Sequence, residues 1–149
     1  MGQLTELLGS SVYIDANIVV YAVEGYEIHA GPIKSLLKAL TDQELIAVTS
    51  ELTLAEVLVK PKRDANSKLE EAYKHFLFPT QSLRNSPVSR EVLEAAAGIR
   101  ATTALKLPDA IHLATAINEQ CDSFLTNDNR FKNMAGVKVI LLGQLPSTE

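Results

Sequence analysis

The sequence contains one cysteine, no tryptophan and only 5% aromatic residues. Because Cys121 has no second cysteine to pair with, the chain suits a reducing compartment, and Cys121 is expected in the core. No apolar run approaches the ~20 residues of a membrane span, and residues 1–9 lack the basic and apolar segments of a secretory signal. We therefore expect a cytoplasmic protein that does not enter a membrane.

The chain also lacks an excess of basic residues, since its net charge is −4. This argues against a protein that coats nucleic acids generally, which is usually basic. It does not exclude a nuclease, which needs carboxylates at its centre and basic residues only around them. The sequence has no Cys/His cluster typical of zinc, no glycine-rich nucleotide loop and no nucleophile elbow.

The 149 residues, 46% of them hydrophobic, are enough for one domain with a proper core, covering residues 1–149. Strands are predicted at 12–14, 45–48, near Leu83, at 123–126 and at 137–142. Helices are predicted to begin near Ile18, Gly31, Ser50, Asn66, Ser89 and Pro108, and Pro61 is expected to end the third of them. This alternation predicts an α/β protein with a parallel sheet covered on both faces.

Four acidic residues are expected at one edge of this sheet. Asp15 and Asp128 follow the carboxyl ends of two predicted strands. Asp109 is in the first turn of the helix that leads into the strand at 123–126, and Glu56 is in the second turn of the helix after the second strand. Sites in open α/β sheets lie at the carboxyl ends of the strands, so we expect the four carboxylates to meet there.

Four converging carboxylates repel one another and stay ionised together only beside compensating cations. Hard oxygen ligands of this kind suit Mg²⁺ or Mn²⁺. Such an ion orients and deprotonates a water molecule and neutralises the charge that develops on phosphorus, which is the chemistry of phosphodiester hydrolysis. The constellation therefore predicts a metal-dependent phosphodiesterase.

Each acid has a structural alternative when it is taken alone. Asp15 could be a turn residue at a strand end, and Glu56 a solvated helix position. Asp109 could complement the dipole of its helix, and Asp128 could be a turn or cap residue. The prediction depends on the four residues pointing to one edge of the sheet.

Neighbouring polar residues are candidate helpers, each with an alternative. Asn17 either makes an Asx turn or positions Asp15 or a metal-bound water, and Thr126 is either an ordinary strand residue or a contact to phosphate or carboxylate. His112 is expected to be packed or to support a ligand. Arg130 is predicted to bind RNA phosphates, with a solvated surface as the alternative. The same two possibilities apply to Lys60, Lys62, Arg63 and Lys132.

Four motifs follow one another along the chain. They are Ile14-Asp15-Ala16-Asn17, Thr53-Leu54-Ala55-Glu56-Val57, Leu107-Pro108-Asp109-Ala110-Ile111-His112-Leu113-Ala114-Thr115-Ala116, and Phe124-Leu125-Thr126-Asn127-Asp128 with Phe131. In this order they resemble the PIN-domain family, and especially its VapC-like ribonuclease toxins of prokaryotic toxin–antitoxin pairs. The resemblance runs from about Val12 to Leu142, nearly the whole chain.

The resemblance implies a three-layer α/β/α sandwich and an endoribonuclease that depends on Mg²⁺ or Mn²⁺. It implies that the family's metal-binding catalytic acids are Asp15, Glu56, Asp109 and Asp128, with Asn17 and Thr126 as polar helpers. It further implies a homodimer and a small antitoxin whose tail enters the acidic groove. Many members carry another Asp near the fourth acid, where this chain has Asn127 and Asn129, so one or two ions remain possible.

Two other functions are compatible with parts of the pattern. A PIN-like scaffold could grip RNA or a partner protein without turnover, but the presence of all four acids favours the nuclease. A phosphate-handling receiver or phosphatase domain would need paired Asp residues around the first strand and a Lys near the active edge. The chain offers Asp15 followed by Asn17, and Lys138 lies inside its predicted strand.

Overall fold

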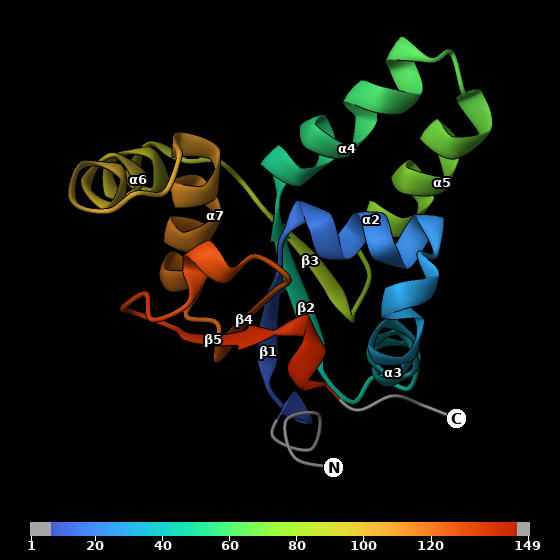
Figure 1. Cartoon of the computed structure of the whole chain (residues 1–149), viewed down its shortest axis with the longest axis horizontal. Coiled ribbons are helices and arrows are strands. Elements are labelled where there is room, and N and C mark those ends of the chain that lie inside the picture. The colour runs from blue at the N-terminus through green and yellow to red at the C-terminus, as the bar shows by residue number, and fades with distance from the viewer. Residues whose placement is uncertain (1–6, 146–149) are drawn as a thin grey trace.

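A five-stranded parallel sheet forms the centre of the computed structural model, which describes residues 7–145 (Figure 1). The expected domain, 1–149, reaches beyond this range, so both of its ends lie outside the described residues. The strands are β1 (Ser11–Ile14), β2 (Ile46–Ser50), β3 (Leu83–Ser86), β4 (Ser123–Thr126) and β5 (Lys138–Leu141). Their order in the sheet is β3-β2-β1-β4-β5, and every neighbouring pair is parallel. The predicted strands and their parallel arrangement are confirmed.

Helices cover both faces of the sheet, which gives the expected three-layer α/β/α fold (Figure 1). The helices are α2 (Ala16–Glu24), α3 (Ala30–Thr41), α4 (Glu51–Arg63), α5 (Ser67–Leu77), α6 (Arg90–Thr102) and α7 (Leu107–Asn118). Short 3₁₀ turns η1 (Glu27–His29), η2 (Asn129–Phe131) and η3 (Leu142–Gln144) complete the described elements. Helices α2 and α3 lie over one face, α7 lies over the other with α6 packed against it, and α4 and α5 extend together away from the sheet.

The alternation of side chains along β1 explains how the two layers are held to the sheet. Val12 and Ile14 are fully buried in the core beneath α2 and α3, whereas Tyr13 between them is fully buried in the core beneath α7. Successive side chains of a strand point to opposite faces, so each face receives its own apolar residues. In the sheet register Tyr13 lies beside Val48 of β2 and Phe124 of β4.

Helix starts follow the capping rules that the sequence indicated. The Ser50 hydroxyl accepts from the Leu52 N–H at 3.0 Å, the Asn66 amide oxygen from the Leu69 N–H at 3.1 Å, and the Ser89 hydroxyl from the Val92 N–H at 3.1 Å. Caps of this kind stabilise a helix by about 1 kcal/mol each. They fix where α4, α5 and α6 leave the loops.

Two details of the predicted helices are wrong. Helix α4 continues through Pro61 to Arg63, because the residues after the proline keep their backbone donors, and the Asp64 N–H bonds to the Lys60 carbonyl at 3.0 Å. The sequence pattern also predicts an apolar face of Leu52 and Ala55, with Val59 as a further candidate. Val59 is 57% exposed, however, and α4 instead buries Thr53, Val57 and Leu58. The cause is that α4 packs against α2 and α5 as well as the sheet, which shifts its buried face.

Each helix within residues 7–145 is too short or too polar to cross a lipid bilayer.

Candidate active site

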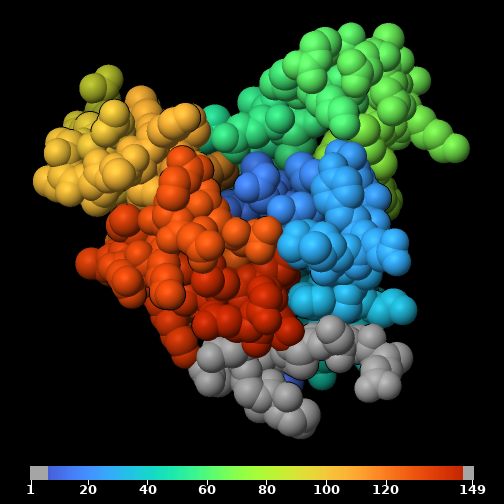
Figure 2. Space-filling model, in the orientation of Figure 1, coloured from blue at the N-terminus to red at the C-terminus, as the bar shows by residue number. Residues whose placement is uncertain are grey.

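The predicted acids come together in one cavity at the carboxyl edge of the sheet. The cavity has a volume of about 210 Å³ and is lined by Asp15, Ala16, Asn17, Glu56, Asp109, His112, Asp128 and Arg130. Six of the seven residues predicted for the site are in this lining, and the seventh, Thr126, donates a hydrogen bond to Asp15. Figure 2 shows the surface hollowed between the residues of α6 and α7 and those of α4 and α5, with α2 at the base of the hollow.

Asp15 is held at the junction of β1 and α2. Its side chain is buried, and its Oδ1 accepts a hydrogen bond from the Ile18 N–H at 3.2 Å, which caps α2. Its Oδ2 accepts a hydrogen bond from the Thr126 hydroxyl at 2.5 Å. Burial raises the pKa of Asp15, although these two hydrogen bonds lower it in part. Asp15 therefore has a structural role at the end of β1, as the cap of α2, and is also a fixed carboxylate that a nearby cation would stabilise.

Thr126, at the end of β4, links two of the acids. It is fully buried, its hydroxyl donates to Asp15, and its oxygen accepts from the Asp128 backbone N–H at 3.0 Å. The hydroxyl thus makes the contact to a carboxylate that the sequence suggested. Because its one proton is directed to Asp15, Thr126 acts on the site through that residue, and direct contact with phosphate stays a prediction.

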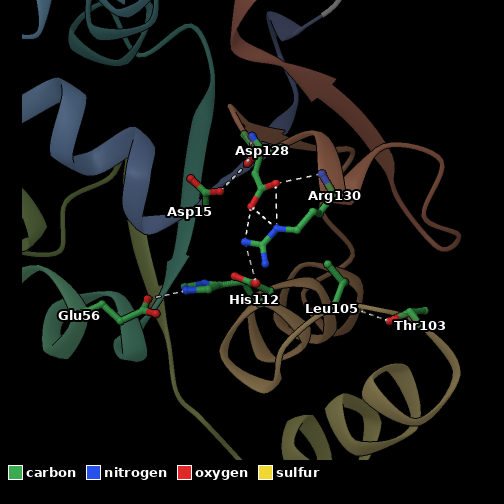
Figure 3. A network of polar contacts seen from close by, with 9 residues as sticks. Asp15, Glu56, Thr103, Leu105, His112, Asp128 and Arg130 are labelled. Carbon is green, nitrogen blue, oxygen red and sulfur yellow. Dashed lines mark hydrogen bonds and ion pairs between the residues drawn. The ribbon is translucent and has the colours of Figure 1, made fainter.

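Arg130 is paired with two of the four acids. Its Nη2 lies 2.5 Å from Asp128 Oδ2 and 3.1 Å from Asp109 Oδ2, and its Nε lies 3.0 Å from Asp128 Oδ2 (Figure 3). The hydrogen bond from Arg130 lowers the pKa of Asp128. Burial raises the pKa of Asp109, and Arg130 offsets only part of this rise. The guanidinium therefore supplies positive charge between these two carboxylates.

Glu56 is paired with His112, which reaches it from the opposite wall. Figure 3 shows the imidazole of His112, on α7, pointing to the Glu56 carboxylate on α4. His112 Nε2 lies 2.6 Å from Glu56 Oε1, and Nδ1 lies 2.5 Å from the Tyr13 hydroxyl. His112 is buried, so the expectation that it is packed or supports a ligand agrees with its position.

Tyr13 is the site residue that the sequence analysis missed. It lies directly before Ile14 and Asp15 in a strand that looks wholly apolar. The available signal was that a tyrosine in a central strand must bury its hydroxyl, which then needs a polar partner. The ion pairs of Arg130 were also missed, although Arg130 follows Asp128 by only two residues in η2.

The other basic residues predicted around the site are not in the cavity lining. Among the five basic candidates, all of which the structure describes, Arg130 alone lines it. Lys62 bonds to Glu70 of α5 at 2.9 Å, and Arg63 lies 3.9 Å from Asp64. These positions agree with the solvated-surface alternative for Lys62 and Arg63.

The donor set of the cavity fits a hard divalent cation. Its acids offer carboxylate oxygens, which are the ligands that Mg²⁺ and Mn²⁺ prefer. Over residues 7–145, however, no three His, Cys, Asp or Glu side chains surround one point closely enough to hold an ion. In the described structure Arg130 pairs with both Asp109 and Asp128, and His112 Nε2 lies beside Glu56 Oε1. A cation shared by three acids would require Arg130 to move aside.

Cavity size does not identify this site. A larger cavity of about 570 Å³ lies between α3, α5 and the start of β3, with Leu37, Leu40, Phe76 and Leu83 in its lining. None of the four acids lines it. All four acids line the smaller, polar cavity instead.

The chain belongs to the PIN domain family, because the family model of the PIN domain matches residues 12–137. PIN domains are generally nucleases. No curated protein sequence gives a match.

Solved structures of toxin–antitoxin proteins have a similar fold. A toxin–antitoxin complex from Klebsiella pneumoniae is 25% identical, with a TM-score of 0.66 over 88% of this chain and 97% of that chain. VapBC2 from Rickettsia felis, bound to a DNA fragment from its promoter, is 17% identical, with a TM-score of 0.70 over 88% of this chain and 98% of that chain. VapC20 from Mycobacterium tuberculosis, a toxin that cleaves the Sarcin-Ricin loop, is 14% identical, with a TM-score of 0.60 over 76% of this chain and 86% of that chain.

Proposed function

We propose that this protein is an endoribonuclease that hydrolyses RNA phosphodiester bonds with Mg²⁺ or Mn²⁺, and that it is the toxin of a toxin–antitoxin pair. The observation that carries the proposal is the cavity itself. Four carboxylates from separate parts of a PIN-domain chain line one space of about 210 Å³. A protein that only bound RNA would not need four acids at its binding site, because these carboxylates would repel the negatively charged RNA.

The catalytic and metal-binding acids in this proposal are Asp15, Glu56, Asp109 and Asp128. A bound cation would supply a polarised water nucleophile and positive charge beside the phosphate. Asp15 contributes a carboxylate with a fixed position, because Ile18 and Thr126 hold both of its oxygens. Asp109 and Asp128 contribute a pair whose repulsion Arg130 offsets while no metal ion is between them.

Arg130 and Asn17 are the proposed contacts to RNA. The Arg130 side chain is 50% exposed, so its guanidinium can turn from the acids to a substrate phosphate when a cation replaces it. Asn17 is exposed at the wall of the cavity, two residues after Asp15. Thr126 is assigned to the site as the residue that holds Asp15 in place.

The structural neighbours support a proposal for the partners of the protein. The neighbours from Klebsiella pneumoniae and Rickettsia felis are toxin–antitoxin proteins. We propose that this chain likewise binds a small antitoxin, whose tail would enter the acidic cavity, and forms a homodimer. We further propose that residues 1–149 make up one domain acting in the cytoplasm.

The receiver or phosphatase alternative does not suit the described fold. Lys138 is the first residue of β5, at the amino end of a parallel strand. The acids lie at the opposite, carboxyl edge, so this lysine is not positioned to reach a phosphate bound there. A non-catalytic PIN-like scaffold is the remaining alternative, and turnover distinguishes it.

Cleavage of single-stranded RNA tests the proposal. The purified protein would be incubated with Mg²⁺, with Mn²⁺ and with EDTA, beside an Asp15→Asn variant. Asp42→Asn makes the same chemical change at an exposed residue of the α3 terminus and is the matched control. We expect cleavage that requires the metal, is lost in Asp15→Asn and persists in Asp42→Asn. Equal cleavage by Asp15→Asn and the unchanged protein would contradict the proposal.

A further inference from the structure

Two hydrogen bonds connect the interior of the protein to the Glu56 carboxylate. They run from the Tyr13 hydroxyl to His112 Nδ1, at 2.5 Å, and between His112 Nε2 and Glu56 Oε1, at 2.6 Å. We propose that Tyr13 and His112 are positioning residues that fix Glu56 as a metal ligand. This inference rests on the proposed function, because it assigns a task to residues behind the same site.

Packing immobilises Tyr13 and His112, the two inner residues of this hydrogen-bonded series. Tyr13 is fully buried and stacks on Phe124 with ring centroids 5.1 Å apart. His112 is 3% exposed, and its ring meets Tyr13 edge-on with centroids 5.8 Å apart. Neither ring can turn without opening the core beneath α7, so the position of the imidazole is set by the fold.

The direction of the hydrogen bonds follows from their outer end. An ionised Glu56 only accepts hydrogen bonds, so His112 Nε2 carries the proton that it donates. In the neutral imidazole Nδ1 is then the acceptor, and the Tyr13 hydroxyl donates to it. Tyr13 thereby fixes the tautomer in which His112 can hold Glu56.

Glu56 is the acid that most needs such a support. Asp15 is held by Ile18 and Thr126, and Asp128 by Arg130. The Glu56 side chain is 32% exposed and projects from α4, which leaves the sheet together with α5 (Figure 1). Among the contacts found within residues 7–145, His112 is its one hydrogen-bond partner. The bond occupies Oε1 and leaves Oε2 available for a cation in the cavity.

Binding of Mn²⁺ alone, measured by isothermal titration calorimetry without RNA, tests the inference. His112→Leu removes the donor to Glu56 and keeps an apolar side chain in the buried position. His112→Gln keeps an amide N–H near the position of Nε2, and Tyr13→Phe removes only the hydroxyl. The matched control is His75→Leu, because His75 is an exposed residue of α5 outside the acidic cavity.

We expect His112→Leu to weaken Mn²⁺ binding about 10- to 100-fold, as loss of a residue that orients a metal ligand typically does. His112→Gln should recover most of the affinity, Tyr13→Phe should show an intermediate loss, and His75→Leu none. Thermal unfolding in EDTA checks that each variant is folded. If His112→Leu does not fold, Tyr13→Phe decides, because it keeps the aromatic packing.

Three outcomes would overturn the inference. The first is unchanged Mn²⁺ affinity in a folded His112→Leu protein or in Tyr13→Phe. The second is an equal loss of Mn²⁺ affinity in His112→Gln and His112→Leu. The amide N–H of the glutamine would then have no effect, which would mean that only the packing of the ring matters. The third is no Mn²⁺ binding by the unchanged protein, which would also remove the metal site of the proposed function and is thereby distinguishable from the other two.

Discussion

Arg130 lies between two acids that come from different elements, with its Nη2 3.1 Å from Asp109 on α7 and 2.5 Å from Asp128 after β4. The guanidinium thus occupies the position that a cation shared by these two carboxylates would take. It supplies positive charge there, as the cation would. A metal ion and Arg130 therefore compete for Asp109 and Asp128. This competition leads to two predictions about Arg130.

The first prediction concerns metal affinity. Arg130→Ala should bind Mn²⁺ several-fold more tightly than the unchanged protein, because the ion no longer displaces a guanidinium from two carboxylates. Lys132→Ala, which removes the same charge from an exposed neighbour, is the control and should change the affinity little. Titration calorimetry in low salt measures both. Weaker Mn²⁺ binding in Arg130→Ala than in Lys132→Ala would contradict the competition.

The second prediction concerns RNA. If Arg130 turns to a phosphate once the metal is bound, Arg130→Ala should weaken binding of single-stranded RNA and reduce the slope of log K against log salt by about 0.7, the value for one phosphate contact. Fluorescence anisotropy with a non-cleavable RNA, at several salt concentrations, gives this slope. An unchanged slope would show that Arg130 does not contact phosphate.

A third prediction separates the hydroxyl of Thr126 from its shape. Thr126→Val keeps the size of the side chain but leaves the Asp128 N–H without its acceptor and the Oδ2 of Asp15 without its donor. We expect a loss of about 1–3 kcal/mol in unfolding free energy and a strong loss of cleavage, whereas Thr126→Ser should retain both.

Thr115→Val is the matched control for that change. Thr115 is equally buried, but its hydroxyl donates to the Ile111 carbonyl of its own helix, which keeps its helical partner after the substitution. Urea unfolding and RNA cleavage should both be affected more by Thr126→Val than by Thr115→Val. The reverse order would exclude the assigned role of Thr126.

The fourth prediction concerns pH and the metal-free protein. Burial raises the pKa of Asp15 in the folded state above its unfolded value of about 3.9. The folded protein therefore binds more protons than the unfolded one as pH rises from that value through the raised pKa, so stability falls over this window. Asp109 acts in the same direction, and Asp128, whose pKa is lowered, acts in the opposite one.

Asp15→Asn tests this sign directly. Asparagine caps a helix about as well as aspartate but carries no buried charge. In EDTA at pH 7.5 the variant should be at least as stable as the unchanged protein, and its stability should fall less as pH rises from about 4. With excess Mn²⁺ the order should reverse, since only the unchanged protein gains about 2.7 kcal/mol at 100 times Kd. Thermal unfolding of both proteins, in EDTA across this pH range and with excess Mn²⁺, provides the comparison.

The positions of the four acids could be predicted because each depends on local sequence and on one rule of topology. Asp15 and Asp128 follow strands, Asp109 begins a helix, and parallel strands place all such points at one edge. The residues around them could not be predicted in the same way. The bond between Tyr13 and His112 joins positions 99 residues apart, which no spacing within a single element reveals.

Side-chain pairing and helix packing account for the other differences. Arg130 was expected to face RNA, but its pairing with Asp109 depends on how closely η2 approaches α7. The prediction of the buried face of α4 is wrong because the sequence pattern does not reveal that this helix packs against α5 as well as the sheet. Both depend on tertiary contacts that hydrophobic periodicity does not encode.

Anomalous diffraction from a crystal soaked in Mn²⁺ tests the central claim most directly. The claim is that the carboxylates of Asp15, Glu56, Asp109 and Asp128 hold a divalent cation. It predicts an anomalous peak in their cavity with carboxylate oxygens about 2.0–2.3 Å away. It also predicts that the Arg130 side chain has rotated away from Asp109 and Asp128. No peak at saturating Mn²⁺, with Arg130 still bonded to both acids, would contradict it.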